Sequence, residues 1–301
     1  MNLEKSLKPP SILTRIFLSP EETRLRAGWR LLLQTILLVV LVVLLSLIVY
    51  LPASAFGLPV DSLLFGQINE FITISFSVFL ARRFLDRRSF SSLGFKINWQ
   101  TLADLSVGII ISALMTGFIY WAMITLNWTT FSGYIWQTQN GYMVMLNILP
   151  MLLVFILVGW NEELLSRGYH LQNLSEGTNM TWAVILSSAV FGALHWSNPN
   201  ATWNSVVGIS LAGIFLAFAY TRTRMLWLPI GLHIGWNFFE GIVFGFPVSG
   251  LNTYHLINHT VSGPELWTGS TFGPEAGLMI LPALVLGTLL VIFYTRSRTP
   301  A

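Results

Sequence analysis

Three groups of polar residues stand out in this chain because each interrupts a stretch that is otherwise apolar. The first is a pair of adjacent acids, Glu162 and Glu163, followed by Arg167. On a helix, Glu163 and Arg167 face each other in the favourable order, whereas Glu162 points about 100° away. One acid is therefore expected to be neutralised and the other to remain free. A free carboxylate in an apolar setting can act as a general base.

The other two groups offer neutral side chains that can hold water or donate hydrogen bonds. His195 closes an apolar stretch that contains Phe191. His233 and Asn237 are four residues apart, so an imidazole and a carboxamide share one helix face. Two such donors that face one spot are unusual in lipid, although the pair could also tie two membrane helices together by hydrogen bonds. Each group alone also has a plain structural explanation, such as a solvated helix end or a packed histidine.

The elements that must position these groups are membrane helices. Hydrophobic residues make up 54% of the 301 residues and charged residues 10%, whereas a soluble domain carries about 25% charged residues. A spanning helix needs about 20 mostly apolar residues. The sequence predicts eight spans, which are Leu31–Leu51, Leu63–Leu80, Leu102–Leu126, Tyr142–Leu174, Asn179–His195, Trp203–Tyr220, Trp227–Phe246 and Ala276–Tyr294.

The basic residues predict the orientation of these spans. All 16 Lys and Arg residues fall on one side of the eight-span arrangement, and the alternate loops 52–62, 127–141, 196–202 and 247–275 contain none. Cytoplasmic loops carry the excess of Lys and Arg in membrane proteins. We therefore expect a multi-pass protein of the cell membrane with both termini in the cytoplasm.

The same pattern divides the chain into four segments. Residues 1–30 form an N-terminal arm in the cytoplasm, and 31–141 hold the first three membrane helices. Residues 142–246 hold the helices with the polar groups, and 247–301 an extracytoplasmic loop, the last helix and a short tail. The arm is too long and too mixed in charge for a signal peptide, so the first span is expected to be retained.

Helix geometry allows the polar groups to share one cavity. With a rise of about 1.5 Å per residue, Glu162, His195, His233 and Asn237 fall within about three helical turns of one another in depth. We expect Glu162 to belong to a polar stripe that faces a water-filled cavity. The other members of this predicted stripe are Ser166, Tyr169, His170 and Asn173.

Taken together and in this order, the three groups carry a family resemblance. The patterns EExxxR at 162–167, FxxxH at 191–195 and HxxxN at 233–237 resemble the CAAX-protease and bacteriocin-processing family (CPBP, or Abi), which includes type II CAAX prenyl proteases. The resemblance covers chiefly residues 143–246, with similar segments at 27–30 and 92–95. It implies an all-α bundle of eight transmembrane helices around an enclosed polar chamber. It also implies glutamate-dependent peptide hydrolysis without a covalent intermediate.

The resemblance also implies a role for each residue. Glu162 is the general base that deprotonates water, and His195 orients this water and passes a proton on. His233 and Asn237 donate to the oxyanion. Glu163 and Arg167 fix the helix and leave Glu162 without a counter-ion. Which of the two adjacent acids is the base stays open, because an error in the helix face would exchange them. No cofactor and no metal are expected.

Other functions compete with this interpretation. Glu162, His195 and His233 could supply three zinc ligands, although the chain has no HExxH motif and Asn237 offers an amide that zinc rarely accepts. Ser210, in Gly208-Ile209-Ser210, could be a serine nucleophile, but no membrane histidine obviously partners it. The chain has no Gly-Asp pair for aspartyl proteolysis and no cysteine. A non-enzymatic membrane scaffold or immunity protein is the remaining class.

The expected partners are membrane lipid and a peptide or membrane-protein substrate. This substrate could be lipidated or could carry a leader peptide. Nucleic acid is excluded, because no basic cluster is interleaved with aromatic residues.

Overall fold

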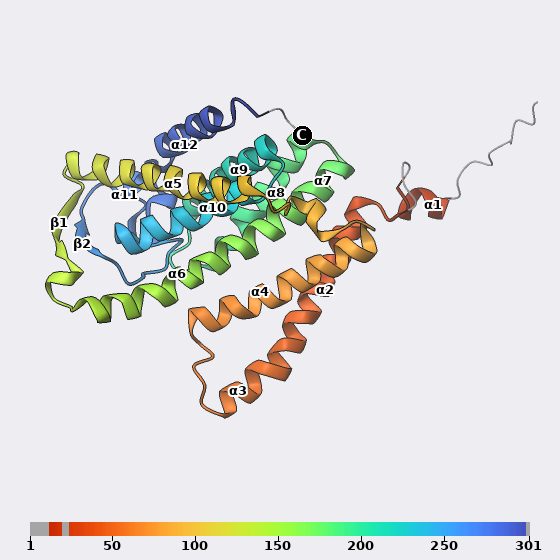
Figure 1. Cartoon of the computed structure of the whole chain (residues 1–301), viewed down its shortest axis with the longest axis horizontal. Coiled ribbons are helices and arrows are strands. Elements are labelled where there is room, and N and C mark those ends of the chain that lie inside the picture. The colour runs from red at the N-terminus through yellow and green to blue at the C-terminus, as the bar shows by residue number, and fades with distance from the viewer. Residues whose placement is uncertain (1–11, 20–23, 299–301) are drawn as a thin grey trace, which may run out of the picture.

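The computed structural model describes residues 12–19 and 24–298, so the predicted basic residues Lys5 and Lys8 of the arm lie outside the described residues. Helices dominate the fold, and two short strands lie at one end (Figure 1). Six helices of the described chain are long and apolar enough to cross a membrane. They span Ala27–Ala55, Leu63–Leu85, Trp99–Thr125, Gly141–Gly177, Met180–Ser197 and Trp203–Thr223. The chain is thus an α-helical multi-pass membrane protein.

Several of these spans combine two or more elements. The first consists of α2 (Ala27–Leu45), a π-helical turn and α3 (Leu51–Ala55), and the second of α4 (Leu63–Leu80) and a π-helical turn. The fourth joins α6 (Gly141–Glu163), the π-helical segment Leu164–His170 and α7 (Leu171–Gly177). The single-element spans are α5 (Trp99–Thr125) and α9 (Trp203–Thr223), and α8 (Met180–Leu194) ends in a 3-10 turn.

Two further apolar helices are shorter than these six. One is α10 (Trp227–Asn237), which continues as the π-helical segment Phe238–Val243, and the other is α12 (Ile280–Thr295). Both coincide with predicted spans, but neither is long enough to be assigned to the membrane by length and composition. The short helices α1 (Ile12–Phe17) and α11 (Glu265–Thr268) lie outside the apolar spans.

Local sequence explains where many of the helices begin. The first turn of a helix has backbone N–H groups without partners, and a preceding Ser, Thr or Asn side chain can accept from them. Five helices of the described chain begin after such a residue, whose side-chain oxygen accepts from the backbone of the first turn. These capping residues are Ser62, Asn98, Asn140, Asn179 and Thr202.

The centre of the bundle is α10, which crosses α5 at very short distance. At the crossing, a Cβ on Gly108 would come within 2.6 Å of the backbone nitrogen of Leu232, so only glycine allows this approach. The hydroxyl of Ser112 donates to the carbonyl oxygen of Leu232 at 2.6 Å. Because α10 is buried on all sides, any polar side chain on it must face a neighbouring helix or a cavity.

The two strands join loops that are far apart in sequence. Strand β1 (Thr129–Tyr134) follows α5, and it pairs in antiparallel fashion with β2 (Ile257–Val261), which follows α10. Both lie at the left-hand end of the molecule in Figure 1. No sequence feature predicted this pairing, which ties the long loop before α12 to the rest of the structure.

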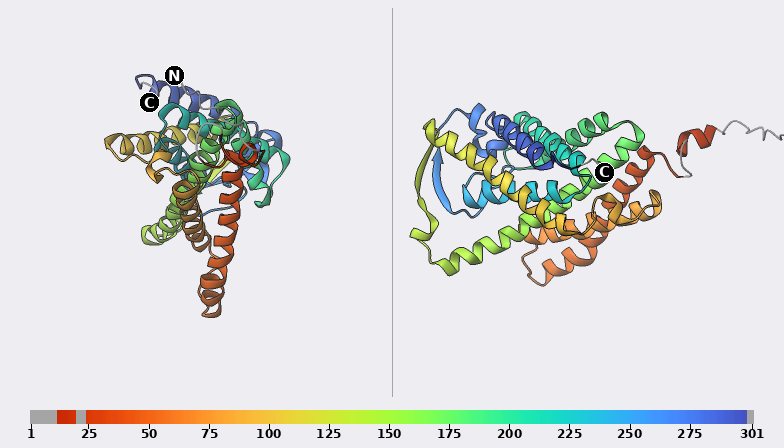
Figure 2. Two further views of the ribbon diagram at one scale, coloured as in Figure 1. Left: turned by 90° about the vertical axis from the view of Figure 1, so that its right-hand side faces the viewer. Right: turned by 45° about the horizontal axis from the view of Figure 1, so that its top comes forward.

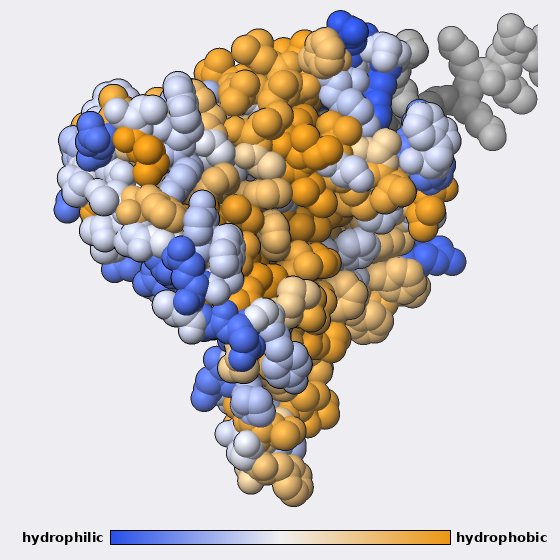
Figure 3. Space-filling view, turned by 60° about the vertical axis from the view of Figure 1, so that its left-hand side comes forward, coloured by the Kyte–Doolittle hydropathy of each residue, from blue (hydrophilic) through white to orange (hydrophobic). Residues whose placement is uncertain are grey.

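The opposite end of the bundle holds a network of ion pairs. Asp86 pairs with Arg30 and Arg82, both at 2.8 Å, and Glu176 pairs with Arg30 at 2.7 Å. Between the two ends, the surface is a broad hydrophobic band, with hydrophilic residues gathered at the left and at the upper right of Figure 3. The charged network therefore marks one rim of an apolar belt, as expected for a protein that spans a bilayer.

The first helices diverge from this bundle. Helices α2, α3 and the beginning of α4 project from the other helices as an arm (Figures 1 and 2). At the opposite end of α4, Trp160 of α6 donates to the hydroxyl of Ser75 at 3.0 Å. The divergence leaves space between α2, α4 and α6, and the candidate site opens into this space.

Candidate active site

Glu163 forms the expected ion pair at the C-terminal end of α6. Its side chain is 0% exposed, and its Oε1 accepts from Nη1 of Arg167 at 2.8 Å. Arg167 also donates to the carbonyl oxygen of Gly213 at 3.1 Å and stacks over the ring of Phe191 at 4.2 Å. Glu163 is thus a buried and neutralised acid.

Glu162, one residue earlier, is in a different environment. Its side chain is 29% exposed and lines a cavity of about 440 Å³ between α4, α6, α8 and α10. Its Oε2 lies 3.7 Å from Nε2 of His195 and 3.8 Å from Nε2 of His233. No described residue forms a hydrogen bond with this buried oxygen. The structure therefore brings Glu162 and both predicted histidines together around one point.

His195 is fixed by the end of its own helix. It follows Leu194 at the C-terminus of α8, and its Nδ1 lies 2.8 Å from the carbonyl oxygen of Phe191. A carbonyl oxygen only accepts, so Nδ1 carries the proton. In the neutral ring Nε2 is then an acceptor, and it is the atom that faces Glu162.

His233 is held by the acid that pairs with Arg167. Its Nδ1 lies 2.8 Å from Oε1 of Glu163, so Nδ1–H donates to the carboxylate and Nε2 turns towards Glu162. The four-residue spacing of His233 and Asn237 predicted that they share a face, but it did not predict this contact. The sequence did carry a signal for it. When one nitrogen of a buried histidine faces a functional site, the other nitrogen usually needs a hydrogen-bond partner.

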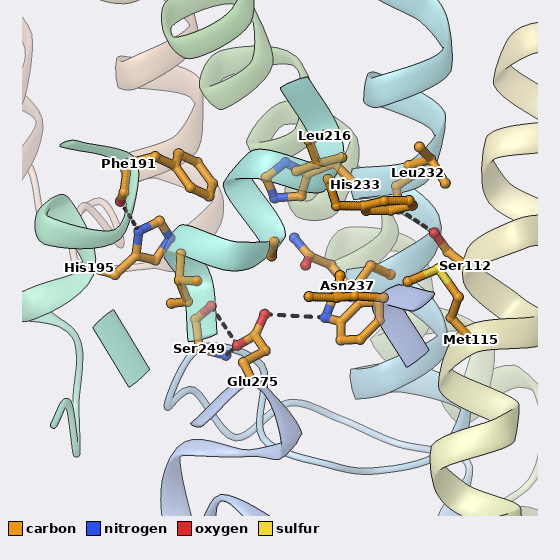
Figure 4. A pocket seen from close by; sticks show the side chains of 15 residues that line it. Ser112, Met115, Phe191, His195, Leu216, Leu232, His233, Asn237, Ser249 and Glu275 are labelled. Carbon is orange, nitrogen blue, oxygen red and sulfur yellow. Dashed lines mark hydrogen bonds between the residues drawn. The ribbon is translucent and has the colours of Figure 1, made fainter. Parts of the chain in front are cut away.

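Asn237 lies one turn beyond His233 and lines the same cavity, as well as a smaller pocket of about 40 Å³ next to it. In Figure 4, the side chains of His233 and Asn237 project from α10 into the smaller pocket, which His195 borders from the other side. All four predicted site residues therefore border one connected space.

Glu275 completes the wall of the smaller pocket, and no motif predicted it. Its carboxylate accepts from the backbone nitrogen of Ser249 at 2.6 Å, from the Ser249 hydroxyl at 2.8 Å and from Nε1 of Trp236 at 3.2 Å (Figure 4). Burial raises the pKa of Glu275, although the hydrogen bonds from Ser249 and the nearby His195 oppose this rise. These contacts fasten the loop before α12 to α10.

Glu70 is a second residue of the site that no sequence motif predicted. It lies on α4 and lines the larger cavity together with Glu162. A signal was available, because Glu70 is the only charged residue between Leu63 and Leu80. An ionisable residue inside a membrane span is a functional candidate in its own right.

The predicted polar stripe is only partly correct. Ser166 lines the cavity with Glu162, but Tyr169 and Asn173 do not. Tyr169 is fully buried with its hydroxyl near the carbonyl oxygen of Arg30, and Asn173 contacts Asp86 at 3.4 Å. The reason is that residues 164–170 wind as a π-helix, so the face expected from 3.6 residues per turn does not continue.

The groups of the competing mechanisms are arranged as follows. The hydroxyl of Ser210 donates to the carbonyl oxygen of Val206 at 2.7 Å and is not among the residues that line either pocket of the site. Within ranges 12–19 and 24–298, no group of three or more His, Cys, Asp or Glu side chains is arranged to hold a metal ion.

Comparison with known proteins finds two partial matches to membrane peptidases. Residues 143–239 match the family described as "Type II CAAX prenyl endopeptidase Rce1-like". Over 87 residues the chain is 33% identical to the Bacillus subtilis (strain 168) protein named "Putative membrane peptidase YdiL", an alignment that covers 29% of this chain and 34% of that protein. No solved structure matches the chain. The segment from 143 to 239, which contains all six residues predicted from the sequence, is therefore similar to the type II CAAX prenyl endopeptidase family.

Proposed function

We propose that this protein is an intramembrane endopeptidase that hydrolyses a peptide bond with water activated by Glu162. Water adds to the carbonyl carbon while its proton passes to Glu162. The C–N bond then breaks, and the leaving nitrogen takes up this proton. No covalent bond forms between enzyme and substrate.

The observation that carries the proposal is the contrast between the two adjacent acids. Glu163 is buried and accepts from both Arg167 and His233, so it is occupied in holding other groups. Glu162 is accessible from the cavity, and its Oε2 faces two imidazole nitrogens at distances too long for direct hydrogen bonds. A water or a substrate carbonyl fits between groups at such separations. This arrangement favours Glu162 as the base.

The two histidines suit different roles, because their other nitrogens have different partners. Nε2 of neutral His195 is an acceptor, so this ring can orient the attacking water. The carboxylate of Glu163 stabilises positive charge on His233, so this ring can present Nε2–H to a developing oxyanion. Asn237, on the same face of α10, supplies a second donor. Donors of this kind contribute roughly 3–4 kcal/mol each to the transition state in other hydrolases.

The membrane arrangement follows from the same proposal. We infer that α10 with its π-helical extension and α12 complete eight spans, with both termini in the cytoplasm of a cell-membrane protein. The charged network around Asp86 and Glu176 lies at the end where the predicted cytoplasmic loops gather. The four segments predicted from the sequence are part of this proposal, with 142–246 as the catalytic core. The larger cavity is the catalytic chamber.

The direct test is detection of new N-termini in membranes. Membranes that contain the wild-type protein are compared by N-terminal proteomics with membranes that contain Glu162→Gln or Glu163→Gln at equal abundance. We expect at least one N-terminus that requires the wild-type enzyme and disappears in Glu162→Gln. Persistence of every such terminus in Glu162→Gln would contradict the proposed base. Persistence in both variants would exclude a glutamate mechanism, and the absence of any terminus that depends on this protein would leave a non-enzymatic scaffold as the better interpretation.

A further inference from the structure

Glu70 is an acid in a place where a charge is costly. It is followed on α4 by the exposed apolar residues Phe71 and Ile72, and it is itself exposed. A charged side chain in a membrane span costs several kcal/mol unless it faces water or a partner. Glu70 lines the catalytic cavity, and no described Lys or Arg is paired with it. Its position therefore calls for a function in the cavity.

Hydrogen bonds fix the position of the Glu70 carboxylate relative to Glu162, the proposed base. Nε2 of Gln67 donates to Oε2 of Glu70 at 3.0 Å. Oε1 of Gln67 accepts in turn from Nδ2 of Asn161 at 3.1 Å, and Asn161 directly precedes Glu162 on α6. A chain of two hydrogen bonds thus fixes Glu70 on α4 relative to the part of α6 that carries the proposed base.

Glu70 and Glu162 give the α4 and α6 walls of the cavity a negative charge that favours a cation. The ionisable residues that line it are Glu70, Glu162, His195 and His233, and no described Lys or Arg is among its lining residues. Arg167 is fully buried behind the site and neutralised by Glu163. In a cavity with apolar walls, two carboxylates raise the local concentration of positive groups and repel negative ones. Beside Glu70, a basic side chain meets a counter-ion, whereas a free C-terminal carboxylate meets a like charge.

We propose that Glu70 is a specificity-determining residue that binds the Lys or Arg side chain of an internal peptide segment close to the scissile bond. The inference rests on the proposed protease function and names its substrate class. Gln67 orients the Glu70 carboxylate towards the bound cation, and the water held near Glu162 attacks the neighbouring peptide bond. The cavity thus selects internal segments with a basic residue over peptides cleaved next to a free C-terminal carboxylate.

The test uses purified full-length protein and a library of internally quenched peptides. Each peptide carries Lys, norleucine or Glu at one position, so that norleucine keeps the apolar stem of Lys but removes its charge. Wild type, Glu70→Gln and Glu70→Lys are compared. Cleavage by Glu162→Gln is measured and subtracted, so that only Glu162-dependent cleavage is counted. Glu265→Gln, an acid on the exposed helix α11, is the matched control.

We expect wild type and Glu265→Gln to prefer Lys over norleucine at one position by about tenfold or more in kcat/KM, mostly through KM. Glu70→Gln should lose most of this ratio, and Glu70→Lys should favour Glu at the same position. The preference should persist when the peptide amino terminus is acetylated. A preference that disappears on acetylation instead would assign the cation to a free amino terminus and overturn the side-chain assignment.

The remaining outcomes separate the two proposals. Glu162-dependent cleavage with no preference for Lys, or with the same preference in Glu70→Gln, overturns the role of Glu70 alone. Absence of any Glu162-dependent cleavage overturns the protease function and the inference with it.

Discussion

The buried pair of Glu163 and Arg167 gives the sharpest test of how the site is held together. Substituting Arg167→Met keeps most of the side-chain volume but leaves Glu163 with His233 as its single side-chain partner. Breaking a buried pair from one side costs about 3–5 kcal/mol, because a charge remains without compensation. Loss of the stacking on Phe191 adds about 1–2 kcal/mol. We expect the melting temperature to fall by roughly 10 °C or more.

The double variant Glu163→Gln with Arg167→Met separates charge from packing. It removes both charges of the pair, so most of the lost stability should return. Activity should stay low, because the ring of His233 no longer has a carboxylate to orient it. The assay is thermal melting in detergent, followed by fluorescence, with cleavage of one identified substrate in parallel. The reasoning would be refuted if Arg167→Met melted at the wild-type temperature. It would also be refuted if the single and double variants had equally low melting temperatures.

Four further predictions test the rest of the site and its setting. Asn237→Ala should lower kcat about 100-fold or more with little change in substrate affinity; an unchanged kcat would remove it from the oxyanion site. Activity should survive strong chelators, whereas one zinc per chain that is lost together with activity would assign a metalloprotease. Reporter fusions at 57, 135, 199 and 260 should read extracytoplasmic and those at 90, 176 and 223 cytoplasmic, and a cytoplasmic reading at 135 or 260 would contradict eight spans. Burial lowers the pKa of His259 from its usual 6.5 to about 4, so the unfolded chain binds more protons in this window and stability should fall as the pH drops from 6.5 to 4. His259→Gln should reduce this acid sensitivity in melting curves, and an unchanged pH profile would show that His259 does not cause it.

Local features of the fold were predictable from sequence, because they depend on neighbouring residues. The helices starting at Leu63 and Trp203 begin where predicted, since apolar runs follow the capping residues Ser62 and Thr202. The pairing of Glu163 with Arg167 followed from their spacing alone. The predicted spans Trp227–Phe246 and Ala276–Tyr294 extend beyond α10 and α12, because α10 continues as a π-helical segment and residues 277–279 form a bend and a turn instead of a helix.

Features that depend on contacts between distant segments could not be predicted. The hydrogen bond from His233 to Glu163 joins residues 70 positions apart, and no local pattern encodes it. Glu275 reaches the pocket through a loop whose path depends on the pairing of β1 with β2. The π-helical segment after Glu163 also breaks the 3.6-residue period on which the predicted polar stripe relied.

The loop that carries Glu275 has a consequence for how the protein is made. Its backbone rests on Gly208 of α9, where a Cβ would overlap the carbonyl oxygen of Glu275, so the loop can seat only after α9 is in place. A ribosome therefore releases the helices with Glu162, His195, His233 and Asn237 before the wall of their pocket exists. During synthesis the nascent chain holds these groups in an unfinished site. Assembly of the complete pocket is deferred until the segment with Glu275 has been made.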